Sequence, residues 1–79
     1  AEDPLTGETA LLKVVRIQDL DSAKELIGSG ADVNYQDKLG FSALMRAVET
    51  GYLKMAEALI GSGADISLTN ADGLTALDI

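Results

Sequence analysis

The side chains with the greatest capacity for chemistry in this 79-residue chain are carboxylates. The chain has 13 Asp or Glu against 6 Lys or Arg, giving a net charge of −7, and it contains no His and no Cys. A Ser-His-Asp triad, thiol chemistry, disulfides and the usual zinc sites are therefore excluded. The negative charge also argues against nucleic acid as a partner, because neutralising phosphates requires a basic surface.

Two short motifs imitate ligand sites, and each fails at a required position. Asn70-Ala-Asp72-Gly73 is similar to the middle of a calcium loop, but Leu68 and Ile79 occupy the places of its first and last ligands. Gly28-Ser-Gly30 could begin a dinucleotide fingerprint, but Val33 stands where the third Gly belongs, and the preceding pattern is helical. We therefore expect no metal site and no cofactor.

Paired carboxylates could still support general acid catalysis. Asp32 and Asp65, however, recur at the same position of an internal repeat, which is typical of structural turn residues. We therefore predict no catalytic residue, and the chain is not expected to be an enzyme. No apolar run approaches the roughly 20 residues that span a bilayer, so membrane insertion is not expected either.

The internal repeat has a period of 33 residues. The segment Leu-Ile-Gly-Ser-Gly-Ala-Asp occurs at 26–32 and again at 59–65. A third copy begins at Gly73, where Gly-Leu-Thr-Ala-Leu matches the Gly-Glu-Thr-Ala-Leu that begins at Gly7. The whole chain, 1–79, is predicted to be a single domain, with a lead-in at 1–6, full repeats at 7–39 and 40–72, and a partial repeat at 73–79.

Each repeat is predicted to begin with a short helix. Thr9, Ser42 and Thr75 stand at the repeated position where a hydroxyl can cap a helix N-terminus, so a helix should follow each of them. Apolar residues then recur at i, i+3 and i+4, which predicts two-turn helices over about 9–17 and 42–50.

A second helix follows in each repeat, over about 20–27 and 53–60, with Asp19 as the expected N-cap of the first. Glycines end both second helices. Gly51 can supply the left-handed residue between the helices of the second repeat, but Gln18 stands there in the first. Keeping the same geometry at Gln18 would cost roughly 1 kcal/mol, so we expect that turn to differ locally.

These residues resemble the ankyrin repeat, a 33-residue unit with a Gly-x-Thr-Pro-Leu-His start and a Gly-Ala-Asp-Val-Asn close. In the first unit the matching positions are Gly7, Thr9, Leu11, Leu26, Ile27, Gly30, Ala31, Asp32, Val33 and Asn34. The family's Pro and His are missing from every start. The resemblance implies an all-α, ankyrin-type helix-turn-helix solenoid with projecting β-turn or hairpin fingers, built by stacking helices too short to be stable alone.

The resemblance also implies a protein–protein interaction module that binds a partner protein through finger loops and a concave inner-helix face. The corresponding finger residues are Tyr35, Gln36, Lys38, Leu39, Phe41 and Leu74, and the inner-helix residues are Lys13, Arg16, Arg46, Glu49 and Thr50. Stacking should place Phe41 and Leu74 side by side. Changing Leu39 or Phe41 to Asp is expected to weaken partner binding and leave helical circular dichroism and melting nearly intact.

The role of the three basic residues on the inner helices is open between two interpretations. Lys13, Arg16 and Arg46 either form a patch for an acidic partner segment or belong to a solvated face balanced by Glu49 and Asp19.

The apolar finger residues Leu39 and Phe41 either pack against neighbouring fingers or form an anchor patch.

A different class of function is a structural one, in which the chain is a piece of a longer stack or self-associates through its open C-terminal end. A cytoplasmic location is the expectation, and an exported chain with a processed N-terminus remains open, because the absence of Cys fits both.

Overall fold

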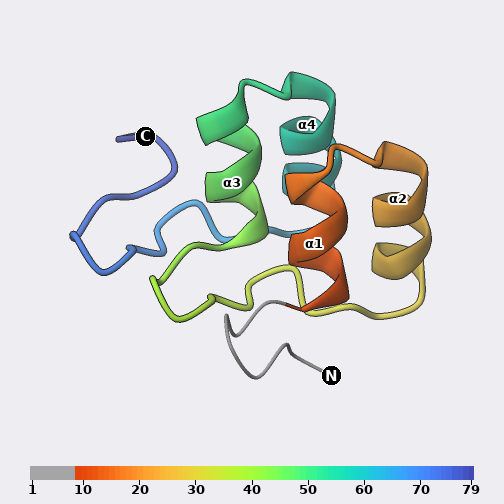
Figure 1. Ribbon diagram of the computed structural model, residues 1–79, viewed down its shortest axis with the longest axis horizontal. Helices are drawn as coiled ribbons and strands as arrows, with labels where there is room; N and C mark the ends of the chain where they lie inside the picture. The colour runs from red at the N-terminus through yellow and green to blue at the C-terminus, as the bar shows by residue number, and fades with distance from the viewer. Residues whose placement is uncertain (1–8) are drawn as a thin grey trace.

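The computed structural model describes residues 9–79, which form four helices and no strand. They are α1 (Ala10–Arg16), α2 (Leu20–Gly28), α3 (Ala43–Thr50) and α4 (Leu53–Gly61). In the described part of the chain, α1 packs against α2 and α3 against α4, and the two pairs meet through α1 with α3 and α2 with α4 (Figure 1). The predicted all-α stack of helix pairs is confirmed.

Side-chain caps fix the starts of three helices. The hydroxyl of Thr9 accepts the N–H of Leu12 at 3.3 Å, and Ser42 accepts the N–H of Met45 at the same distance. Asp19 accepts the N–H of Ser22 at 3.1 Å. These three predicted N-caps are confirmed, and each satisfies a backbone donor that the helix itself leaves unpaired.

The third repeated start behaves differently from the prediction. No helix follows Thr75, because residues 76–78 form only a turn. The cap is also reversed, since the Thr75 N–H and hydroxyl both donate to Asp78 Oδ2, at 3.0 and 3.1 Å. Only Ala76 of this turn is buried. The prediction of a third helix was wrong, because the bonds from Thr75 to Asp78 take the place of the N-cap bond and hold a turn.

The two helix pairs turn in the same way between their helices. Gly51 is left-handed, with φ of 73°, and the N–H of Tyr52 donates to the carbonyl of Ala47. Gln18 is left-handed as well, with φ of 62°, and the N–H of Asp19 donates to the carbonyl of Val14. The first turn therefore keeps the shared geometry, and the expectation of a local difference at Gln18 was wrong.

The core lies between the helix pairs. Helices of seven to nine residues are too short to be stable in isolation, so burial of their apolar stripes supplies the missing free energy. The most deeply buried large side chains come from three of the helices and are Leu11, Val15, Leu44, Met45, Met55 and Leu59. Within residues 9–79 no helix has the length and apolar character needed to cross a bilayer.

Candidate functional site

The loop before α3 forms a tight turn, residues 35–41, which we call the first finger. The Asp37 carboxylate organises it: Oδ1 accepts the N–H groups of Leu39 and Phe41, both at 2.9 Å. The backbone adds bonds from the Asp37 N–H to the Phe41 carbonyl and from the Gly40 N–H to the Asp37 carbonyl. A β-turn, which the ankyrin resemblance implies for the fingers, is therefore present at this position.

Residues 68–74, the second finger, repeat this turn with a neutral side chain. Asn70 occupies the place of Asp37, and its Oδ1 accepts the N–H groups of Asp72 and Leu74 at 2.9 and 3.1 Å. The N–H of Gly73 donates to the carbonyl of Asn70 at 3.0 Å. An amide oxygen is therefore sufficient to build the turn, and the second carboxylate oxygen of Asp37 is left for another partner.

The two fingers are tied to each other. Gln36 Nε2 donates to the carbonyls of Gly40 and Thr69, at 2.8 and 2.7 Å, and the N–H of Ala71 donates to the Leu39 carbonyl at 3.0 Å. The backbones approach so closely that a Cβ on Gly40 would lie 2.7 Å from the Ala71 nitrogen. These contacts hold the fingers side by side as one surface (Figure 1).

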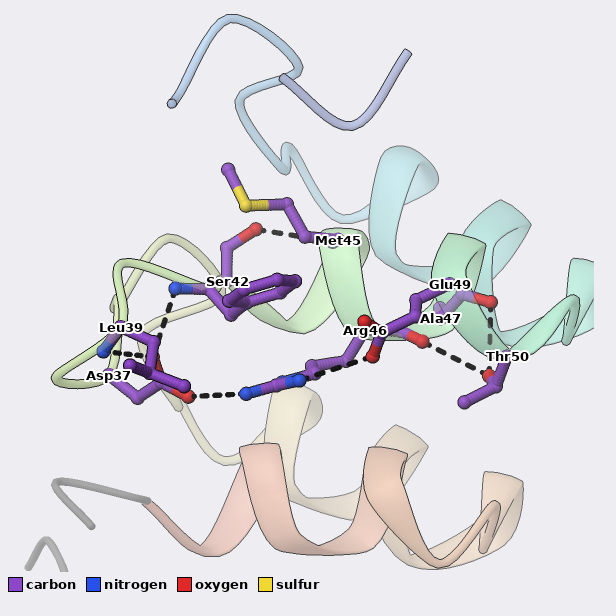
Figure 2. A network of polar contacts seen from close by, with 9 residues as sticks. Asp37, Leu39, Ser42, Met45, Arg46, Ala47, Glu49 and Thr50 are labelled. Atoms are coloured by element: carbon purple, nitrogen blue, oxygen red, sulfur yellow. Dashed lines mark hydrogen bonds and ion pairs between the residues drawn. The ribbon is translucent and has the colours of Figure 1, made fainter. Parts of the chain in front are cut away.

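Arg46 of α3 joins the first finger to the inner helices. Its Nη2 lies 3.1 Å from Asp37 Oδ2 and its Nη1 lies 3.1 Å from Glu49 Oε1. The guanidinium also lies over the Phe41 ring, 3.9 Å from the centroid. Figure 2 shows the Arg46 side chain reaching from α3 between Asp37 at the finger and Glu49 on the next turn.

The predicted inner-helix residues lie on α1 and α3, which are neighbours. Lys13 and Arg16 are exposed on α1, and Glu49 and Thr50 are exposed at the end of α3. Arg46 is not a solvated cation of a patch, because Asp37 and Glu49 both pair with it. The solvated-face interpretation names Glu49 and Asp19 as the acids that balance these cations. Glu49 does pair with Arg46. Asp19 instead accepts hydrogen bonds from Ser22.

Two apolar finger residues that sequence reasoning treated alike have different surroundings. Leu39 is 60% exposed at the tip of the first finger, whereas Phe41 is partly buried and packs against the core. Changing Phe41 to Asp would therefore lower the stability of the fold as well as any affinity. An unchanged melt therefore stays a prediction for Leu39 alone. Leu74 is 40% exposed on the second finger, and Tyr35 is partly buried against the core.

Sequence reasoning missed the role of Asp37 and Asn70, which build the fingers. The signal was present, because both stand 33 residues apart and each is followed three positions later by a glycine with positive φ, Gly40 and Gly73. An Asx residue that accepts backbone N–H groups ahead of a left-handed glycine is a common turn pattern.

Two carboxylates outside the fingers, Asp65 and Asp78, hold local backbone structure. The Ser67 hydroxyl and N–H both donate to Asp65 and lower the pKa of that carboxyl. The N–H and hydroxyl of Thr75 lower the pKa of Asp78 in the same way. Among residues 9–79, no three acidic side chains are grouped closely enough to hold a metal ion. Asp65 and Asp78 thus act as local hydrogen-bond acceptors.

Comparison with known proteins agrees with this architecture. The family model for ankyrin repeats, described as three copies, matches residues 1–78. A solved structure, the ankyrin repeat domain of Bcl-3, a unique member of the IkappaB protein family, matches with a TM-score of 0.97 and 37% identity over 99% of this chain and 34% of that chain. This chain thus spans about a third of that structure's length. Comparison with curated protein sequences finds no match. With the repeat period, the paired helices and the finger turns all in agreement, the chain belongs to the ankyrin-repeat family, whose repeats are protein–protein interaction modules.

Proposed function

We propose that this chain binds another protein through the two joined fingers and the neighbouring face of α1 and α3, which together we call the recognition surface. Its members are Tyr35, Gln36, Lys38, Leu39, Phe41, Leu74, Lys13, Arg16, Arg46, Glu49 and Thr50. The hydrogen bonds between the fingers and the pairing of Arg46 with Asp37 support the proposal, because they join these elements into one surface.

The observation that carries the proposal is the position of Leu39. Its side chain is 60% exposed, although its backbone is held at both polar groups: the N–H donates to Asp37, and the carbonyl accepts from Ala71 of the other finger. An apolar side chain on a backbone that is already ordered loses little conformational freedom when a partner covers it. Leu39 therefore has the properties of an anchor residue.

The charges favour a partner segment with acidic groups beside an apolar one. Although the chain as a whole is acidic, its Lys and Arg are unevenly distributed. Lys24 and Lys54 lie on the second helices, and the other four, Lys13, Arg16, Lys38 and Arg46, belong to the recognition surface. A partner that places an apolar side chain on Leu39 and carboxylates near Lys13, Arg16 and Lys38 would match this distribution, whereas Arg46 already pairs with Asp37 and Glu49.

The test compares two matched variants of the full chain. Leu39→Asp changes the proposed anchor, and Ile17→Asp changes a residue that is 55% exposed at the opposite end of α1 from the fingers. Proteins captured by wild type and by Ile17→Asp but lost with Leu39→Asp identify the partner. Titration calorimetry should then show affinity reduced about tenfold or more by Leu39→Asp, equivalent to about 1.4 kcal/mol. Circular dichroism and melting should not change. Equal affinity of both variants for the captured partner would remove Leu39 as the anchor.

A further inference from the structure

The motif that is similar to a calcium loop places an Asp-Gly pair, Asp72 and Gly73, in the second finger. No other Asp or Asn of the chain is followed by Gly. The following residue matters because a backbone nitrogen can attack the carboxyl carbon of the Asp before it. Glycine has no Cβ to hinder that approach. The pair is therefore the most reactive such site along this chain.

The carboxylate of Asp72 is held by no partner in the described part of the chain, and the residue is exposed. The first finger shows the contrast. There the Asp37 carboxylate accepts the N–H groups of Leu39 and Phe41 and also pairs with Arg46. Asp37 is thus fixed in place, whereas the Asp72 side chain can rotate towards its own backbone.

Exposure at this position is a property of the finger. The equivalent residue of the first finger is Leu39, which is 60% exposed although the second finger lies beside it. The neighbouring finger contacts the backbone there, through the bond from the Ala71 N–H to the Leu39 carbonyl, and leaves the side chain in solvent. The Asp72 side chain would therefore stay exposed beside a further finger as well.

The attacking nitrogen, that of Gly73, lies inside a closed turn. Its N–H donates to the carbonyl of Asn70 at 3.0 Å. The N–H groups of Asp72 and Leu74, before and after it in the chain, both donate to Asn70 Oδ1. Asn70 itself is buried. The nitrogen can turn towards the Asp72 carboxyl carbon only after these bonds break, so local opening of the finger must precede the reaction.

We propose that Asp72 isomerises spontaneously to isoaspartate, at a rate set by opening of the second finger. The Gly73 nitrogen attacks the protonated side-chain carboxyl of Asp72. A carbon–nitrogen bond forms, and the carboxyl hydroxyl leaves with the nitrogen's proton as water. Water then adds to the cyclic imide. Breaking the new bond restores Asp72, whereas breaking the original main-chain bond to nitrogen leaves Gly73 attached through the side chain.

The isoaspartyl linkage disrupts the second finger, because it adds one carbon to the main chain between Asp72 and Gly73. The N–H groups of Gly73 and Leu74 both reach Asn70 in the present turn, and the added carbon moves them away from it. The same turn presents the Ala71 N–H that joins the two fingers. An effect on partner affinity rests on the proposed function, whereas the isomerisation itself does not.

Ageing of the full chain at neutral pH tests the proposal, with isoaspartate quantified by peptide mapping and by an isoaspartyl methyltransferase assay. It should accumulate at position 72 of the wild type and be lost in Asp72→Glu, whose longer side chain closes the ring less readily. Asn70→Ala should speed the reaction about tenfold, equivalent to about 1.4 kcal/mol. Asn70→Asp is the matched control and should keep the wild-type rate, because Asp37 builds the same turn in the first finger.

Isomerisation at position 72 no faster than at Asp32, which precedes a β-branched Val, would overturn the site. Equal rates in Asn70→Ala and Asn70→Asp would overturn control by the finger. A further measurement does not depend on the folding of any variant. In wild type, urea below the global unfolding transition should speed isomerisation in parallel with hydrogen exchange at the Gly73 amide. Isomerisation that ignores urea until the whole chain unfolds would contradict local opening. None of these results involves a partner, so they stand or fail separately from the proposed function.

Discussion

The guanidinium carbon of Arg46 lies 3.9 Å from the centroid of the Phe41 ring. Phe41 in turn packs against the core, so a charged side chain of α3 rests on the outer edge of the apolar interior. The planar guanidinium can stack on the ring and still point one nitrogen at Asp37 and another at Glu49. A lysine could not make all three contacts, since its ammonium is a single point charge.

The first prediction concerns the ion pair between Asp37 and Arg46. Asp37→Asn should lower the free energy of unfolding by about 0.5–1 kcal/mol, the upper range for partly exposed pairs. The finger turn should persist, because Asn70 builds the same turn in the second finger. Urea denaturation measures the loss, and Glu49→Gln is the control, because that pair is more exposed and should matter less. A loss no larger than that of the control would show that the Asp37 pair adds nothing.

The second prediction concerns the left-handed residue between α1 and α2. Gln18→Gly should stabilise the chain by about 1 kcal/mol, because glycine adopts positive φ without the Cβ clash. For a domain of this size that corresponds to a rise in Tm of about 4–8 °C. Gly51→Ala is the reciprocal change at φ of 73° in open space and should destabilise by a similar amount. Thermal melts that show no gain for Gln18→Gly would mean that the turn is not held in this conformation.

The third prediction separates backbone strain from the close approach of the fingers. Gly40 and Gly73 have similar positive φ, 82° and 77°, but only Gly40 has backbone atoms within 3 Å of a new Cβ. Gly73→Ala should therefore cost about 1–2 kcal/mol for the left-handed conformation alone. Gly40→Ala should cost clearly more and should speed hydrogen exchange at the Ala71 amide, which bonds to Leu39. Equal losses in both variants would show that the fingers separate without penalty.

The fourth prediction concerns acid sensitivity. Bonds from the Ser22 hydroxyl and N–H lower the pKa of Asp19, and those from Thr75 lower the pKa of Asp78. Since the folded pKa lies below the unfolded one, these groups stabilise the fold fully above the ordinary Asp range near pH 4. That contribution is lost as the pH falls through the folded pKa. Carboxyl chemical shifts followed by NMR should report titration of Asp19 below that range, and Ser22→Ala should move its pKa upward. An Asp19 carboxyl that titrates at its ordinary value in wild type would refute the assignment.

Much of this architecture could be predicted from the sequence, because its determinants are local. The 33-residue repeat, the hydroxyl and Asp19 caps and the spacing of apolar residues identify four short helices with their approximate ends. Each of these signals depends on neighbours within a few positions along the chain. The same local reasoning failed at Thr75, where the hydroxyl donates to Asp78 and does not accept a backbone N–H, so that a turn forms in place of the expected helix.

The tertiary structure alone decided which of the predicted surface residues are available. Leu39 and Phe41 are two positions apart and equally apolar, yet one is exposed and the other packs on the core beneath Arg46. Likewise, Leu20 and Leu53 occupy the same place in the repeat, but only Leu20 is covered by the next helix pair. Composition and spacing along the chain set the capacity of a residue to form contacts. Whether it is buried, paired or free for a partner depends on segments about 33 residues away that stacking brings against it.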